Sequence, residues 1–274
     1  MRESGKKLLS AIGNVKRARD FRLYMEDGRR LVDLWQCGGA AVLGHKPASL
    51  VKALKNTAER GLFAPFPGFY EKRLTKALSH IFKNKVFYFY SCENLCCENL
   101  CEKSLEKSLA KNLPPQNTNS IKLWRPFSSF NTDIPFFKAL MPCPIAPSIY
   151  VADKNMQPLD IPASDILPPV ILACTVQAVN NFITNKDRGS AKFQKINDIF
   201  LNGGKENFVQ EGIYIYAHNK INNDQNNDQW EKLFYHFLKE GFLFPPFLDD
   251  PLILPDTLSK GEEDKLCSLL REIV

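Results

Sequence analysis

The middle of this chain is constrained by its prolines. Between residues 114 and 169 they recur at short intervals, for example at Pro142, Pro144, Pro147, Pro162, Pro168 and Pro169. Proline has no backbone N–H and its ring clashes with the preceding helical turn, so the interior of a helix excludes it. This segment therefore predicts loops with one or two short strands, such as residues 148–152, and no long helix.

Periodic patterns of apolar residues occur on both sides of this segment. Helical spacing predicts helices over residues 8–18, 48–60, 70–82, 91–112, 170–184, 230–240 and 261–273, and shorter apolar runs predict strands at 85–90 and 212–217. A hairpin is predicted over residues 21–35, because Phe21, Leu23 and Met25 occupy alternate positions and Asp27-Gly28 supplies a turn. Predicted helices that are followed by predicted strands in this way indicate an α/β fold.

The composition indicates a folded chain and excludes some functions. With 274 residues, of which 44% are hydrophobic, the chain can bury one large core or two modest ones. Its net charge of +6 comes from 36 basic and 30 acidic residues scattered along the sequence, and the densest basic cluster is only Lys16, Arg17 and Arg19. Without a basic stripe or a nucleic-acid motif, we expect no nucleic-acid partner.

The location of the protein is also predicted from the sequence. No apolar run approaches the roughly 20 residues of a membrane span, and the apolar stretch within residues 1–13 is too short for a secretory signal. We therefore expect a cytoplasmic protein without a membrane partner. In that compartment its eight cysteines are expected to be reduced thiols.

Four of these cysteines lie close together. Cys92, Cys96, Cys97 and Cys101 fall on spacings that bring several of them near one helical face, where they could ligate zinc or an iron–sulfur cluster. The spacing matches no standard site, however, and two tandem copies of the sequence CENLC account for the cluster without any metal. The sequence therefore favours thiols and no metal site.

Both ends of the chain resemble one family. Residues 23–33 have the sequence LYMEDGRRLVD and are followed by Gly39 and then by Leu43-Gly44-His45. This order of hairpin, aspartate, glycine-bearing loop and glycine–histidine turn resembles the N-terminal signature of the class III aminotransferases, which are fold-type-I enzymes that use pyridoxal phosphate (PLP). Residues 240–243, then 252–254 and the final helix, are similar to that family's small domain.

The resemblance implies a fold and an assembly. It implies an α/β protein with a reduced three-layer sheet domain of the fold-type-I PLP-transferase kind and a C-terminal α+β subdomain. Residues 1–65 would form the N-terminal segment of the small domain, residues 66–185 a reduced large domain, and residues 186–274 the C-terminal small domain. Because fold-type-I proteins build their sites across a dimer, the resemblance also implies a homodimer.

The resemblance further implies where a cofactor and a substrate would bind. The strand at residues 86–91 is similar to the one that leads to the family's phosphate-binding turn, here Ser91-Cys92-Glu93. This turn lacks the family's glycine, and Glu93 places a negative charge where a dianionic phosphate would bind. The counterpart of the substrate loop contains Gly38 and Gly39, which implies a small amino-acid-like ligand.

The remaining catalytic groups have two interpretations each. Lys138 has a sequence context similar to the family's Schiff-base lysine, but an alternative alignment makes residues 135–151 an earlier loop and leaves no counterpart of that lysine. Asp133 and Asp165 could face the pyridinium nitrogen, or cap loops and helices. Trp124 could stack on the cofactor ring, or lie in the core, which we favour.

Other family features point away from catalysis. Where the family often supplies an arginine for the substrate carboxylate, this chain has Ile253-Leu254-Pro255, and His45 occupies a turn position that favours a structural role. Two hypotheses follow. The first is a degenerate aminotransferase-like protein that acts as a dimeric scaffold or binding protein; the second is an active PLP-dependent aminotransferase that uses Lys138 on an amino acid or amine.

Overall fold

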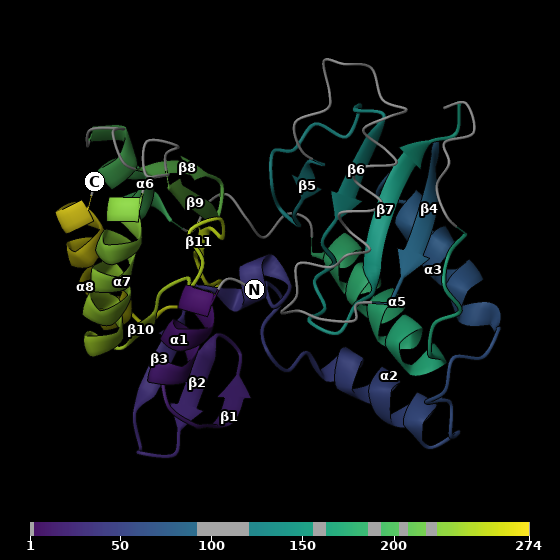
Figure 1. Ribbon diagram of the computed structural model, residues 1–274, viewed down its shortest axis with the longest axis horizontal. Helices are drawn as coiled ribbons and strands as arrows, with labels where there is room; N and C mark the ends of the chain where they lie inside the picture. Colours follow the sequence, from purple (N-terminus) through teal and green to yellow (C-terminus); the bar gives the residue numbers. More distant parts are fainter. Residues whose placement is uncertain are drawn as a thin grey trace. The chain divides into compact units, whose positions relative to one another are not determined.

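The computed structural model describes residues 3–91, 121–155, 163–185, 193–202, 208–217 and 224–273. The chain folds into two compact units (Figure 1). The first unit contains residues 48–126 and 130–184, and the second contains residues 2–47, 127–129 and 185–274. The second unit is thus assembled from the two ends of the chain. No helix within the described residues has the length and the apolar character needed to cross a membrane.

The first unit is a sheet with helices on one face (Figure 1). Its strands are β4 (Lys85–Tyr90), β5 (Leu123–Trp124), β6 (Phe136–Ala139) and β7 (Ser148–Asp153), in the order β4-β7-β6-β5. Its helices are α2 (Ala48–Ala58), α3 (Phe69–Ser79) and α5 (Pro169–Thr184). Strand β7 is antiparallel to both of its neighbours, and β5 is parallel to β6.

Aromatic side chains hold this sheet to its helices. Phe82, just after α3, is buried with its ring centroid 5.0 Å from that of Trp124 and 5.3 Å from that of Phe137. Trp124 also contacts Phe182 of α5, edge to face, at 5.6 Å. Because successive residues of a strand point to opposite faces, Phe137 and Trp124 lie on the helix-covered side, and Lys138 lies on the other.

The second unit contains two small sheets and four α-helices of the described residues. Its elements are α1 (Glu3–Ala11), β1 (Val15–Arg19), β2 (Arg22–Met25), β3 (Arg30–Asp33), the 3₁₀ turn η1 (Gln36–Gly39), α6 (Gln194–Asn202), β8 (Phe208–Glu211), β9 (Tyr214–Ala217), α7 (Asp224–Lys239), β10 (Phe242–Leu243), β11 (Leu252–Ile253) and α8 (Lys260–Ile273). The strand orders are β1-β2-β3-β10 and β11-β9-β8.

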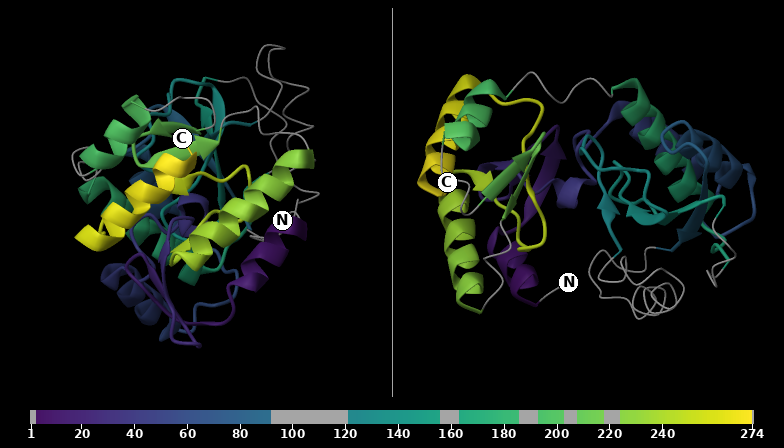
Figure 2. Two further views of the ribbon diagram at one scale, coloured as in Figure 1. Left: turned by 90° about the vertical axis from the view of Figure 1, so that its left-hand side faces the viewer. Right: turned by 90° about the horizontal axis from the view of Figure 1, so that it is seen from above.

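The two ends of the chain meet in the first of these sheets. Strand β10 pairs with β3 in parallel, with Phe242 opposite Val32 and Leu243 opposite Asp33. Helices α7 and α8 lie side by side (Figure 2). Across them, His236 Nε2 lies 2.9 Å from Oε2 of Glu272, and an ion pair joins Lys265 to Glu240. The N-terminal hairpin and the C-terminal helices therefore share one hydrophobic core.

Most predicted elements are present, and the α/β class is confirmed. The hairpin forms between β2 and β3, with Leu23 opposite Leu31. The predicted helix over residues 8–18 is wrong, because the helix ends at Ala11, Gly13 adopts a φ of 86°, and Val15–Arg19 forms an edge strand. That strand is almost fully exposed, so it carries no apolar alternation that could reveal it. Beyond Ser91, the predicted helix 91–112 lies outside the described residues.

A salt bridge ties the hairpin to the last helix. Arg22 donates from Nε to Oε1 of Glu262, at 3.1 Å, and from Nη2 to Oε2 of the same carboxylate. Burial raises the pKa of Glu262, but hydrogen bonds from Arg22 and Ser259 outweigh it and lower that pKa to about 2. The pair is mostly shielded from solvent, since the Glu262 side chain is 13% exposed.

Replacing Phe82 by alanine is expected to lower the free energy of unfolding by about 3–5 kcal/mol, because it removes a buried ring that contacts three others. Phe63→Ala is the matched control, since Phe63 is 61% exposed and its loss should change stability by less than about 0.5 kcal/mol. Urea denaturation followed by circular dichroism measures both. Equal losses in the two variants would contradict the assigned core.

Acidification should weaken the second unit through Glu262. The pKa of this carboxyl is about 2 in the folded chain against an ordinary 4.5, so its contribution is complete above about pH 4.5 and is lost as the pH falls towards 2. The loss amounts to about 3 kcal/mol. Denaturation at a series of pH values should show a flatter profile for Glu262→Gln, whereas Glu231→Gln, which removes only a 3.5 Å surface contact with Lys7, should keep the wild-type slope.

Candidate functional site

The loop after β3 has an unusual backbone. Gln36, Cys37, Gly38 and Gly39 are consecutive residues with positive φ angles, of 48°, 52°, 64° and 114°. A side chain in this region costs roughly 1–2 kcal/mol, so two non-glycine residues here store strain that the surrounding structure must hold in place. Strain of this kind is concentrated at functional sites, which makes this loop a candidate. It contains both glycines that the sequence assigned to a substrate loop.

A buried aspartate fixes the start of the loop. Asp33 Oδ1 accepts hydrogen bonds from the backbone N–H groups of Trp35 and Gln36, each at 2.9 Å. Its Oδ2 lies 2.8 Å from Nε2 of His45, so this carboxylate also holds the histidine of the glycine–histidine turn. The Asp33 side chain is only 2% exposed. One carboxylate thus anchors both the loop and the glycine–histidine turn that follows it.

Hydrogen bonds join the loop to the segment around Asp250 and Ile253. Gln36 donates from Nε2 to the carbonyl of Ile253, at 3.2 Å, while its Oε1 is buried without a hydrogen-bond partner within the described residues. Trp35 Nε1 donates to Oδ2 of Asp250 at 2.7 Å. A Cβ on Gly38 would lie 3.1 Å from Oδ1 of Asp250, so that carboxylate lies directly against the glycine.

This arrangement has a chemical consequence for ligand choice. The Asp250 carboxylate against Gly38 would repel a ligand carboxylate, whereas an arginine would grip one through two charge-assisted hydrogen bonds. The stretch in which the sequence lacks an arginine forms β11, where Ile253 pairs with Tyr214. At these positions the loop therefore faces a carboxylate, and the stretch Ile253-Leu254-Pro255 supplies no arginine.

The predicted phosphate turn follows β4. Both the backbone N–H and the hydroxyl of Ser91 donate to Oδ2 of Asp165, at 2.8 and 3.1 Å. Two further bonds hold the Asp165 segment along the end of β4, from Asp165 N–H to the Phe89 carbonyl and from Phe89 N–H to Ser164 Oγ. Cys92 and Glu93, the rest of the predicted turn, lie outside the described residues. The Asp165 carboxylate therefore accepts hydrogen bonds from both donors of Ser91 that the resemblance assigned to a phosphate.

The other predicted site residues of this unit are not brought together. Lys138 lies in the middle of β6, with Nζ 5.8 Å from the ring centroid of Tyr150 on the neighbouring strand. Trp124 is buried against the helices on the opposite face, at one outer strand of the sheet, whereas Ser91 follows the other outer strand. Asp133 is exposed in the turn before β6, where its backbone N–H donates to Asn131 Oδ1 at 2.8 Å. The described residues include no group of histidine, cysteine and carboxylate side chains that could hold a metal ion.

Sequence reasoning missed one buried charge. Lys85, at the start of β4, has a side chain only 5% exposed, and its Nζ donates to Oδ1 of Asp153 at 2.6 Å and to the carbonyl of Ile134 at 2.8 Å. The sequence offered one sign of this buried charge, which is that Lys85 stands at the first position of an apolar strand. Its pairing with a carboxylate and a carbonyl indicates a structural lysine that joins β4 to β7.

These elements together define a class of fold. The chain has the fold of the PLP-dependent aminotransferases of class III, since solved structures of that class superimpose on nearly its whole length. Ornithine δ-aminotransferase of Plasmodium falciparum matches with a TM-score of 0.64 and 12% identity over 99% of this chain and 98% of that one. An ω-transaminase of Sphaerobacter thermophilus matches with a TM-score of 0.63 and 9% identity over 95% and 90%.

Comparison of sequences gives relatives without an assigned activity. An uncharacterized protein of Borreliella burgdorferi is 26% identical over 96% of this chain and 93% of its own length. An uncharacterized protein of Treponema pallidum is 30% identical over 164 residues, which are 58% of this chain and 50% of that protein. No family model matches the chain. The structural matches, at such low identity, show the fold alone.

Replacing Gly38 by alanine should destabilise the second unit more than the same change at Gly28. Both glycines have positive φ angles, of 64° and 89°, but an added Cβ meets Asp250 at Gly38 and nothing within 4 Å at Gly28. We expect Gly38→Ala to cost about 1 kcal/mol more than Gly28→Ala, because the Asp250 carboxylate must move. Urea denaturation gives the difference. If the two variants lose equal stability, Asp250 does not brace the loop.

Proposed function

We propose that this protein keeps the aminotransferase fold without transaminase activity and acts as a binding or scaffold protein. One observation carries the proposal. The donors of Ser91, which the family resemblance assigns to the cofactor phosphate, are engaged by the Asp165 carboxylate of the chain itself.

The charge at this turn opposes the cofactor. PLP would bring a dianionic phosphate to Ser91, and Asp165 would lie within hydrogen-bond distance of the same donors. Two anions at that separation repel each other, and displacing Asp165 would also release the segment that it holds along β4. Glu93 adds a third negative charge in the sequence of the turn. The residues present at Ser91 therefore do not fit the cofactor.

The geometry of the other candidates supports the same conclusion. A Schiff-base lysine must reach the carbonyl of a cofactor whose phosphate is held at the turn. Lys138 is instead in the middle of a strand, against Tyr150, with its backbone N–H donating to the carbonyl of Lys122 at 3.0 Å. Trp124 lies in the core rather than near Ser91. No pair of these residues is positioned to act on one ligand atom.

The scaffold role is proposed from the fold. Fold-type-I proteins assemble as dimers, and we propose that this chain forms a homodimer in the cytoplasm. In that form it would serve as a binding partner without turnover. The competing proposal is an active aminotransferase that uses Lys138 on an amino acid or amine, and the two make opposite predictions about cofactor binding.

An absorbance spectrum separates these proposals. The purified protein is incubated with PLP, freed of unbound cofactor and scanned through the near-ultraviolet and visible range, beside Lys138→Ala and Lys122→Ala. We expect no visible band from the wild type, because Asp165 engages the phosphate donors. Lys122 is the matched control, since it is an exposed lysine next to the same strand pair.

The outcomes are distinct. A visible band that disappears in Lys138→Ala and persists in Lys122→Ala would overturn the proposal and establish a PLP enzyme. A band that responds to neither variant would come from reaction with other surface lysines, and it would leave Lys138 without the assigned role. Asp165→Ser, which removes the competing charge, should not produce a Lys138-dependent band, because Lys138 stays on β6 against Tyr150.

A further inference from the structure

Exposed aromatic side chains of the first unit gather at one connection. Residues 61–68 join α2 to α3 and run along the surface of this unit (Figure 1). Phe63 and Phe66 in this connection, and Phe69 directly after it, are 61%, 55% and 48% exposed. Among the residues that the structure describes, no other segment exposes three large apolar side chains within seven positions. Because folded chains usually expose such side chains singly, this cluster indicates a surface that a partner covers.

The backbone of this connection favours exposed rings. Pro65 and Pro67 flank Phe66, fix their own φ angles and favour an extended conformation for the residue before each of them. The phenylalanines are three residues apart, which is one turn of an extended, proline-rich backbone. This spacing favours a common side for the three rings, with Phe66 at the centre.

Both ends of the connection are anchored on helices of the unit. At the first end, the carbonyl of Leu62 accepts a hydrogen bond from the N–H of Val170 in α5 at 3.3 Å. At the other end, the guanidinium carbon of Arg73 lies 4.4 Å from the ring centroid of Phe69, and this ring lies 4.3 Å from that of Tyr70. The fold thus holds exposed rings in place, which lowers the entropy that a binding partner must overcome.

The charges at the two ends fit a second copy of the same surface. Glu59 and Arg60 lie just before the connection, and Glu71 and Lys72 follow it; all four are exposed, and none forms an ion pair within the described part of the chain. A two-fold axis near Phe66 would place the start of one connection opposite the end of the other. Arg60 of one copy would then face Glu71 of the other, and Glu59 would face Lys72.

Other occupants fit these charges less well. An anionic membrane surface would bring lipid phosphates towards Glu59 and Glu71, which lie beside the rings and would be repelled. A partner of one sign, acidic or basic, would leave a like charge unpaired at each end of the connection. Only a surface that carries both signs at both ends is complementary, and this surface is itself of that kind.

The apolar area is of the size that the centre of a dimer interface has. A phenylalanine side chain buries roughly 200 Å² when it is covered completely, so three rings that are about half exposed offer roughly 300 Å². A standard interface buries about 800 Å² on each partner, with an apolar centre and a polar rim. The rings would form that centre, and the ends of α2 and α3 would form the rim.

We infer that Phe63, Phe66 and Phe69, with the charges at either end of the connection, form the face by which two copies of this chain associate. The inference rests on the proposed homodimer and names its contact surface. The two Phe66 rings meet at the two-fold axis, and Phe63 and Phe69 lie towards the rim. Truncating a rim side chain changes association little, so the stability of the chain does not depend on Phe63.

Sedimentation equilibrium of the purified full chain over a range of concentrations tests the inference. We expect a dimer, and Phe66→Asp should raise its dissociation constant at least about a hundredfold, because the symmetry repeats the lost ring and the buried charge in both copies. Leu201→Asp is the matched control and should leave the constant unchanged, since Leu201 is 71% exposed on α6 in the second unit. Circular dichroism checks that each variant is folded.

A charge reversal tests the arrangement without altering the rings. Arg60→Glu should weaken the dimer about tenfold, because two carboxylates would then face each other, and so should Glu71→Arg. The double variant exchanges the two charges and should restore the wild-type constant. If the double variant is weaker than both single variants, the copies do not meet in this orientation and the inference is wrong.

The remaining outcomes separate this surface from the proposed function. A wild-type dimer that Phe66→Asp leaves intact would overturn the inference, while the proposed homodimer would stand. A wild type that is monomeric at every concentration would overturn both. A monomer that co-sediments with phosphatidylglycerol vesicles, and loses this property in Phe66→Asp, would assign the rings to a lipid surface instead. The absorbance test with PLP is independent of all these results, because it depends on Ser91, Asp165 and Lys138.

Discussion

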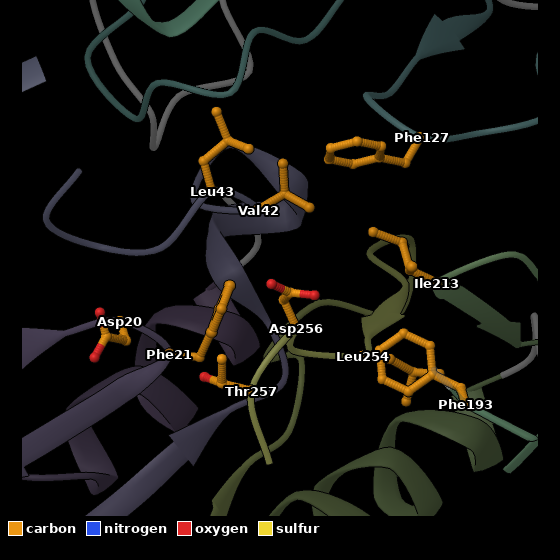
Figure 3. A pocket seen from close by; sticks show the side chains of 10 residues that line it. All are labelled: Asp20, Phe21, Val42, Leu43, Phe127, Phe193, Ile213, Leu254, Asp256 and Thr257. Carbon is orange, nitrogen blue, oxygen red and sulfur yellow. The ribbon is translucent and has the colours of Figure 1, made fainter. Parts of the chain in front are cut away.

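The second unit depends on the parallel pairing of β3 with β10. Backbone bonds run from Val32 N–H to the Gly241 carbonyl and from Leu34 N–H to the Leu243 carbonyl, at 2.9 and 3.0 Å. A further bond joins Ile253 N–H to the Leu34 carbonyl at 2.7 Å. These contacts fix the residues that follow β3, among them Asp33 and the strained loop. They also bring Leu254 and Asp256 beside Phe21 and Val42, which line one pocket of this unit (Figure 3).

The fold of this chain and the charges at its candidate site are separate properties. Asp33 and His45 still hold a glycine-bearing loop in a conformation that costs free energy, which is expected where a ligand or a partner needs that shape. The structure places the carboxylate of Asp165 at Ser91 and that of Asp250 at Gly38, the two positions that the resemblance assigned to a phosphate and to a substrate. A fold that is held by packing and hydrogen bonds does not by itself determine which ligands its charges admit.

The spacing of apolar residues along the chain predicted most of the helices and strands. It did not predict the contacts between residues that are far apart in the sequence. The β2–β3 hairpin, α5 and α8 were found because their apolar residues follow a clear period along the chain. Strand β10 has two residues, both buried, so no period exists to reveal it, and its partner lies at the other end of the sequence. Ser91 was found through resemblance, but Asp165 could not be recognised as its acceptor, because only the folded chain places residues 164–165 beside the end of β4.

The order of the units along the chain sets the order in which they can fold during synthesis. The residues of the first unit are almost contiguous, between 48 and 184, so this unit can form as soon as they have emerged from the ribosome. The β2–β3 hairpin leaves the ribosome before them, yet its open edge at β3 has no strand to pair with until residues 242–243 follow. For most of translation the N-terminal segment thus exposes an unpaired strand edge, which is a template for pairing with other chains.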